Sequence, residues 1–249
     1  LIGSFLNCLS WCLHAQSTIL GRLYCDSCRA VIAWFDNIPV LSFLLLRGRS
    51  RCCRAKISWQ HPVVEAVTAL LFAAAVWRTI GSAGPAEGWD LQAVLLLLRD
   101  LILLSALIVT FLTDLRWYEI YDIVVLPAAA VVGLLNLAAG AGWLGLLVSG
   151  TIGSGFFLLQ SIVSRGRWIG SGDSRVGLLI GLGLGWPLVL PAIFIAYLLG
   201  AGTGIGLLAA GKKEWGGKLP LGTFLAIAAA LTLFFGTPLV EWYLGLINF

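Results

Sequence analysis

Charged residues are scarce in this chain. Of its 249 residues, only 11% are Asp, Glu, Lys or Arg, whereas 59% are hydrophobic. A soluble globular domain has about a quarter of its residues charged. The shortage excludes a disordered chain and argues strongly against a soluble enzyme. Histidine is limited to His14 and His61, which are too far apart in the sequence to suggest a metal or catalytic motif. Methionine is absent, so we expect Leu1 to be an alternative start or the edge of a truncated chain.

Long apolar runs dominate the sequence instead. We expect eight, counting a first one that is short for a full crossing and therefore clipped: 1–13, 62–77, 91–113, 123–140, 143–163, 176–186, 187–210 and 220–247. A helix needs about 20 residues to cross a membrane. The run 176–186 is too short, so its helix should start earlier or continue past Pro187. The sequence predicts an all-α, polytopic membrane helix bundle of about eight spans, with a cytoplasmic insert between spans one and two.

The basic residues orient these spans. If 14–60 is cytoplasmic and the spans alternate, the cytoplasmic segments hold 14 of the 16 Lys and Arg residues. These are Arg22, Arg29, Arg47, Arg49, Arg51, Arg54, Lys56, Arg116, Arg165, Arg167, Arg175, Lys212, Lys213 and Lys218. This is the bias of the positive-inside rule, and it supports both the count and the orientation. The basic stretch from Arg47 to Lys56 is expected to meet anionic lipid headgroups in the bilayer, and no module for nucleic acid is present.

The 30 glycines are expected at contacts between helices. They cluster in runs such as 181–185 and 200–206, where small side chains let helix backbones approach closely. A nucleotide-binding glycine loop would need a preceding strand, which a membrane span does not supply. Arg99 and Asp100 interrupt the third run. Neighbouring residues on a helix point about 100° apart, so a direct ion pair between them is not assured, and we interpret both as structural.

Two aspartates lie at ends of predicted spans on the same membrane face. Asp114 ends the third span and Asp173 opens the sixth, after Gly170 and Gly172. Because the chain crosses outward and returns between them, both should face the cytoplasm. Two neighbouring carboxyl groups share one proton, so one can activate water while the other protonates the substrate. Such aspartic-protease chemistry needs no metal or cofactor, and the glycines would let a substrate backbone approach.

Each aspartate alone also has a structural explanation, since Asp is a common helix cap. For the pair, the helix dipoles suggest a division of roles. Asp173 near a helix N-terminus should hold the charge, and Asp114 near a C-terminus should hold the proton.

With these residues identified, the sequence resembles the type IV prepilin peptidases, the GxGD-type intramembrane aspartic proteases. The resemblance covers nearly the whole chain. It rests on Gly3-Ser4-Phe5-Leu6-Asn7, Cys25-Asp26-Ser27-Cys28, the run from Trp34 to Ser42 with its Asp-Asn-Ile-Pro, His61-Pro62-Val63-Val64-Glu65, Asp114, Asp122, Gly170-Ser171-Gly172-Asp173, and the run Lys218-Leu219-Pro220-Leu221-Gly222-Thr223-Phe224-Leu225. The last run is similar to the family's Pro-Phe-Gly-Pro pattern.

The resemblance implies cleavage of the basic leader peptide of prepilins or pseudopilins at the cytoplasmic face of the bacterial inner membrane. It also implies N-methylation of the new N-terminus with S-adenosylmethionine, a function that depends on the cytoplasmic segment. Asp114 and Asp173 match the catalytic aspartates, and Asp122 matches a further Asp. Arg175 stands where a Lys is usual. Glu65 matches a family Glu and either supports catalysis or pairs with a basic neighbour at the membrane interface.

A zinc site is also implied, in weakened form. The family often has two Cys-x-x-Cys pairs, and four thiolates suit tetrahedral zinc. Cys25 and Cys28 form the first pair, but Ser50 stands where the second should begin. A site would consist of Cys25, Cys28, Cys53 and either Cys52 or a water. Disulfides are improbable in a reducing cytoplasm.

The expected organisation is a partial first span (1–13), a basic Cys-containing insert (14–60) and a protease core (61–249). The alternative is a non-catalytic relative or a transporter whose carboxylates carry protons.

Overall fold

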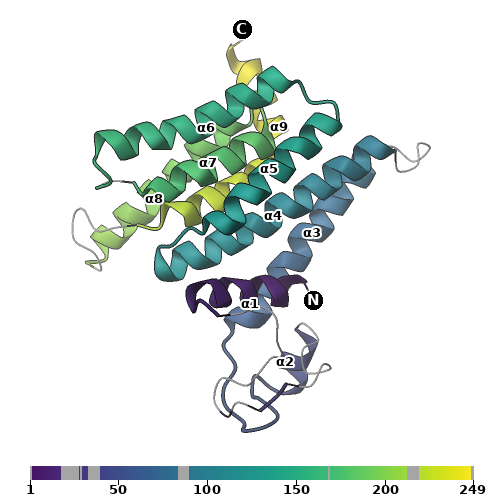
Figure 1. Ribbon diagram of the computed structural model, residues 1–249, viewed down its shortest axis with the longest axis vertical. Helices are drawn as coiled ribbons and strands as arrows, with labels where there is room; N and C mark the ends of the chain where they lie inside the picture. The colour runs from purple at the N-terminus through teal and green to yellow at the C-terminus, as the bar shows by residue number, and fades with distance from the viewer. Residues whose placement is uncertain are drawn as a thin grey trace. The chain divides into compact units, whose positions relative to one another are not determined.

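The structure is a computed structural model, and it describes residues 2–17, 28, 30–32, 40–83, 90–167, 169–211 and 219–247. Over these residues the regular structure is helical, apart from isolated bridges such as that between Arg49 and Lys56. The helices are α1 (Ile2–His14), α2 (Leu41–Leu45), α3 (Gln60–Ala83), α4 (Leu91–Trp117), α5 (Asp122–Ala138), α6 (Trp143–Val163), α7 (Ser171–Leu184), α8 (Val189–Ala209) and α9 (Leu221–Ile247) (Figure 1).

The all-α prediction is confirmed. Each predicted apolar run corresponds to one helix, and only the short α2 was not expected. Five of the described helices are long and apolar enough to cross a membrane: α3, α4, α6, α8 and α9. The others in the predicted set, α1, α5 and α7, are shorter than a standard crossing.

The helix at the sixth run starts earlier than the run itself. α7 begins at Ser171 and ends at Leu184, before the proline at 187 rather than beyond it. It ends there because Gly185 adopts a left-handed φ of 74° and Pro187 cannot continue an α-helix. The extension therefore includes Asp173, which lies in the first helical turn.

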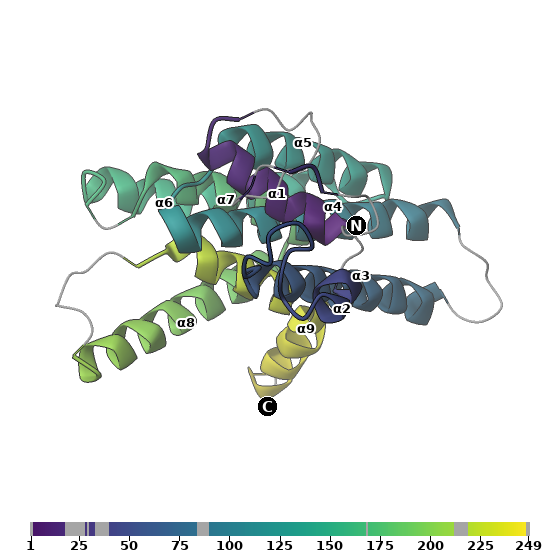
Figure 2. The same ribbon diagram turned by 90° about the horizontal axis from the view of Figure 1, so that it is seen from below.

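The chain divides into two compact units, Leu1–Ala74 and Ala75–Phe249. In the second unit, α7 contacts α4, α5, α6, α8 and α9. Figure 1 shows α6, α7, α5 and α4 running side by side, and α9 packs on α4, α7 and α8 (Figure 2). The helix that carries Asp173 is thus the one with the most helical neighbours among those described.

Glycines allow α6 and α7 to touch through their backbones. A Cβ on Gly153 would lie 2.2 Å from the Gly177 carbonyl oxygen, and a Cβ on Gly181 would lie 2.3 Å from the Ser149 carbonyl oxygen. The Ser149 hydroxyl donates to the Gly181 carbonyl at 2.8 Å. The predicted packing role therefore holds for Gly181, whereas no side chain or foreign backbone lies within 4 Å of a Cβ on Gly185.

Buried charges join several helices of this unit. Arg99 Nε lies 2.7 Å from Asp100 Oδ1, so these neighbours do form the ion pair that helical geometry left open. Asp100 also pairs with Arg78 of α3. Arg99 donates to Asn136 Oδ1 at 3.1 Å and to the Gly183 carbonyl at 2.9 Å. These contacts link α3, α4, α5 and α7, which agrees with the structural interpretation of the pair.

Candidate active site

Asp114 lies in the last turn of α4 and is 5% exposed. The helix ends at Trp117, and the next residue, Tyr118, takes a left-handed φ of 57°. The Asp114 carbonyl accepts the Tyr118 N–H at 3.0 Å at the end of α4, but the side chain of Asp114 binds another helix. Its Oδ2 accepts the backbone N–H of Thr223 at 2.7 Å and the Thr223 hydroxyl at 3.1 Å. Since Thr223 lies in the first turn of α9, Asp114 caps the N-terminus of a different helix.

Asp173 lies in the first turn of α7 and is 6% exposed. Its Oδ2 accepts the backbone N–H of Gly170, the N-cap residue, at 3.1 Å. This is the return contact of a capping box, in which the third helical residue binds the N-cap N–H. The capping role considered for Asp173 is therefore correct, because its side chain stabilises the start of α7.

The two carboxyl groups are close enough for their charges to interact. The Ile120 side chain lies against the start of α7, which carries Asp173, and against the start of α9, which contacts Asp114. A Cβ on Gly172 would meet Ile120 Cβ at 3.0 Å, and a Cβ on Gly222 would meet Ile120 Cδ1 at 3.2 Å. The N-termini of α7 and α9 thus converge on the loop that follows α4. Both carboxylates lie at the positive end of a helix dipole.

This arrangement changes the expected charge distribution. The sequence argument considered only the negative end of α4 near Asp114. The contact with α9 adds two hydrogen-bond donors and the positive end of a second helix to the same carboxylate. Asp173 accepts one described hydrogen bond. The hydrogen bonds therefore favour negative charge on Asp114 more than the local helix position indicated.

The glycines at the site give it close packing. Gly172 and Gly222 both lie against Ile120, and a Cβ on Gly222 would also be 3.1 Å from the Asp114 carboxyl carbon. A Cβ on Gly170 would make ordinary contact, 3.5 Å from Asp173 Oδ2. Sequence reasoning missed Ile120 and Thr223. The similarity of 220–223 to a family pattern was the available signal for Thr223, whereas Ile120 had none.

Asp122 and Arg175 form an ion pair that links the first turns of α5 and α7. Both side chains are more than a third exposed, so the pair contributes little stability. Nearby, the Tyr121 hydroxyl donates to Glu119 in the loop before α5. Partial burial together with this carboxylate raises the pKa of Tyr121 to about 12, so the phenol stays protonated at neutral pH.

Glu65 belongs to a polar cluster in the first unit. It accepts the Ser4 hydroxyl and, at 2.7 Å, the backbone N–H of Val40. The same two helices, α1 and α3, are joined by a second polar contact, in which Asn7 Nδ2 lies 2.6 Å from His61 Nδ1. Glu65 thus binds α1 and the residue before α2, rather than a basic side chain, through its described hydrogen bonds.

Three cysteines gather in the same unit. The thiols of Cys28, Cys52 and Cys53 lie within 4.8 Å of one another and are exposed. Cys25, the fourth expected ligand, falls outside the described residues. Cys28 Sγ is 3.0 Å from Cys52 Sγ, and the Ser50 hydroxyl is 3.1 Å from Cys53 Sγ. The group thus includes both Cys52 and Cys53. The sequence argument expected Cys53 as a ligand and left Cys52 or a water as alternatives for the fourth position.

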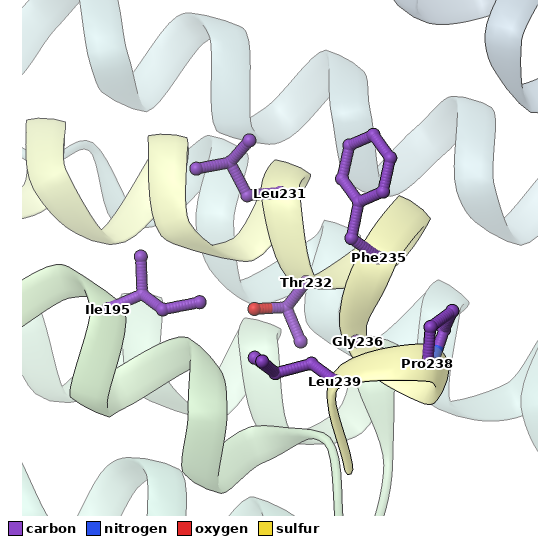
Figure 3. Close-up of a pocket in the computed structure, with 7 residues that line it drawn as sticks. All are labelled: Ile195, Leu231, Thr232, Phe235, Gly236, Pro238 and Leu239. Carbon is purple, nitrogen blue, oxygen red and sulfur yellow. The ribbon is translucent and has the colours of Figure 1, made fainter. Parts of the chain in front are cut away.

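An apolar cavity of about 450 Å³ lies elsewhere, between α8 and α9 (Figure 3). Its lining residues are Ile195, Leu231, Thr232, Phe235, Gly236, Pro238 and Leu239. Thr232 lies nine residues beyond Thr223 on α9, or roughly 13 Å along a helix. The cavity is therefore separate from the carboxylate pair.

The fold and this site define a class: α-helical proteins with membrane-spanning helices and a buried pair of carboxyl groups. Residues 1–79 match the bacterial peptidase A24 N-terminal domain, and residues 101–205 match the type IV leader peptidase family. The chain belongs to that family.

Curated relatives align over most of the chain. A protein of Aeromonas hydrophila is 35% identical over 232 residues, which are 91% of this chain and 76% of the relative. One of Aeromonas salmonicida (strain A449) is 34% identical, covering 92% and 76%. One of Pseudomonas aeruginosa is 30% identical, covering 100% and 92%. Each is named a prepilin leader peptidase/N-methyltransferase. No solved structure matches the chain significantly.

Proposed function

We propose that this protein is an aspartic endopeptidase that removes the leader peptide of type IV prepilins or pseudopilins, with Asp114 and Asp173 as its catalytic pair. The observation that carries the proposal is the convergence of two buried carboxyl groups at the starts of α7 and α9, where Gly172 and Gly222 both lie against Ile120. A pair of carboxyl groups that shares one proton can hydrolyse an amide without a metal or a covalent intermediate.

We assign opposite roles to the two groups on the basis of their hydrogen bonds. Asp114, with two donors from Thr223, is the charged partner and removes a proton from water. The water oxygen then adds to the scissile carbonyl carbon while Asp173 protonates the carbonyl oxygen. When the tetrahedral intermediate collapses, the C–N bond breaks, Asp114 gives its proton to the leaving amine, and Asp173 regains its own.

The membrane topology follows from helix positions and charge. We propose eight spans, with the shorter α1, α5 and α7 crossing alongside the five long helices. The distribution of Lys and Arg then supports a bacterial plasma-membrane protein whose carboxylate pair faces the cytoplasm. Arg116 and Arg175 flank the two aspartates in the sequence, as expected at that face.

The relatives' names supply the substrate class and also include N-methyltransferase. The described cavity between α8 and α9 does not suit S-adenosylmethionine, because its lining is apolar and includes no charged side chain. We therefore assign no methyl-transfer step to described residues of this chain.

The cysteine cluster fits a thiolate-binding metal. The thiols of Cys28, Cys52 and Cys53 are soft donors that lie close enough together to bind the same ion. Zinc is commonly bound by such donors. A bound zinc would link residue 28 to residues 52–53 and supply structure, not proteolytic chemistry. Elemental analysis of the purified protein and of a Cys52→Ser variant tests this. Stoichiometric zinc that is lost in the variant supports the proposal, and its absence from the unmutated protein contradicts it.

The peptidase proposal is tested by co-expression with a prepilin, followed by gel analysis and mass spectrometry of the pilin N-terminus. The unmutated protein should remove the leader, whereas Asp114→Asn and Asp173→Asn should not. Asp90→Asn is the matched control: Asp90 caps the other end of α4, and Asn caps a helix equally well. Cleavage by both active-site variants would refute the mechanism. No cleavage by the unmutated protein would favour a non-catalytic relative or a transporter, and a mass increase of one methyl group would reveal N-methylation.

A further inference from the structure

One residue of α9 holds the Asp114 carboxylate by two separate donors. The backbone N–H and the hydroxyl of Thr223 both bind Oδ2, at 2.7 and 3.1 Å. Thr223 is 4% exposed and Asp114 is 5% exposed, so bulk water does not compete for these bonds. Hydrogen bonds to a charged group at a buried site are among the stronger ones in proteins.

We propose that Thr223 is a positioning residue for Asp114, acting through its hydroxyl; this rests on the proposed peptidase function. The terminal torsion of an aspartate has a broad energy minimum, so a lone hydrogen bond leaves the carboxylate free to rotate. Two donors on Oδ2 restrict this rotation more than one donor would. Because both bind Oδ2, Oδ1 is the oxygen to which neither donor is directed, and it is left to receive the proton of the attacking water.

The contact is a property of this chain rather than of the motif. In the Pro-Phe-Gly-Pro pattern that 220–223 resembles, the last position is Pro, whereas this chain has Thr223. Proline has neither a backbone N–H nor a hydroxyl. The backbone bond to Asp114 therefore needs a residue other than proline at position 223, and the second bond needs a hydroxyl there.

The same helix offers a matched control. Thr232 is also buried, at 1% exposed, but its hydroxyl has no hydrogen-bond partner among the described groups. It lines the apolar cavity between α8 and α9 (Figure 3), nine residues along α9 from Thr223. Replacing either threonine with valine removes one hydroxyl and keeps the branched shape. Only the Thr223 variant loses a described hydrogen bond from that hydroxyl.

The experiment compares Thr223→Val, Thr223→Ser and Thr232→Val in this chain with a prepilin substrate. Thr223→Val should lower kcat about tenfold, since tenfold in rate corresponds to the loss of one charge-assisted hydrogen bond. KM should stay within twofold. Thr223→Ser, which keeps both donors, should restore kcat, and Thr232→Val should leave it unchanged.

Infrared difference spectroscopy tests the contact without any need for activity. The Asp114 carboxylate band, identified by its loss in Asp114→Asn, should shift in Thr223→Val and return in Thr223→Ser. An unmoved band, an unchanged kcat in Thr223→Val, or equal loss in the Ser and Val variants would overturn the inference. An unmutated chain that cleaves no prepilin would instead refute the proposed function, and the infrared band would then decide the inference.

Discussion

The backbone contact between α6 and α7 gives a sharp test of how Asp173 is held in place. Gly153 and Gly155 lie two residues apart on α6, so Gly→Ala is the same chemical change at both positions. A Cβ at 153 would lie 2.2 Å from the Gly177 carbonyl oxygen, whereas a Cβ at 155 has nothing within 4 Å. Ordinary C···O contacts are at about 3.3 Å or more, so Gly153→Ala requires the helices to separate by roughly 1 Å.

The magnitude follows from two opposing effects. Alanine is favoured over glycine within a helix by up to about 1 kcal/mol, and this gain applies to both variants. Overpacking a core costs about 1–3 kcal/mol, and we expect the upper end because the obstructing atoms belong to the backbone and cannot rotate away. The two variants should therefore differ by roughly 3 kcal/mol. That difference corresponds to roughly 6–12 °C in Tm for a chain of this size.

Thermal unfolding of the two variants in the same detergent measures this difference. Prepilin cleavage by folded Gly153→Ala should also fall, because α7 carries Asp173 and a displacement of 1 Å at a catalytic group can cost about a hundredfold in rate. Gly155→Ala should unfold at or above the temperature of the unmutated protein and cleave normally. Equal Tm values for the two variants would refute the close approach of α6 and α7.

Three further predictions concern single contacts. Asp100→Asn should destabilise the protein by about 3–5 kcal/mol, measured by unfolding in denaturing detergent, because the adjacent buried arginine keeps its charge and loses its counter-ion. Gly222→Ala should lower kcat about tenfold with little change in Tm, since the new Cβ would lie 3.1 Å from the Asp114 carboxyl carbon and displace it. The hydrogen bond from Tyr121 to Glu119 should persist through pH 10 and be lost as pH rises through the raised pKa of about 12. Ultraviolet titration should show this step, Tyr121→Phe should remove it, and Glu119→Gln should bring it back toward 10.

Helix positions were largely predictable from the sequence because lipid demands long apolar runs, and such runs are local signals. The first and last residues of α7 were less predictable. They depend on Gly185 and on a first turn that contains polar residues, which a search for apolar runs passes over. The short α2 lies within the insert, in an apolar run that covers only residues 40–46, which is too short for a search for membrane crossings to select.

The two aspartates were predicted from parity, because an even number of crossings returns the chain to the same face. What parity could not supply is the partner of each carboxylate. Thr223 lies 109 residues from Asp114 in the sequence, and no local rule pairs a residue at the end of one helix with the start of another. The dipole argument therefore used only the helix that contains Asp114 and assigned the proton to it. The contact with α9 adds donors that favour the charge on Asp114, and the mechanism that we propose uses this second assignment.

The sequence presented capping and catalysis as competing explanations for the aspartates, but the geometry makes them compatible. Asp173 binds the N-cap N–H of α7, and Asp114 binds an N–H in the first turn of α9. Each carboxylate has a second oxygen, so a structural bond at Oδ2 does not occupy the atom that chemistry would use. Capping also fixes where the two helix starts lie relative to each other, since both pack on Ile120. A buried carboxylate that must be held still for proton transfer is most economically held by a helix terminus, whose N–H groups are unpaired and whose dipole favours the anion.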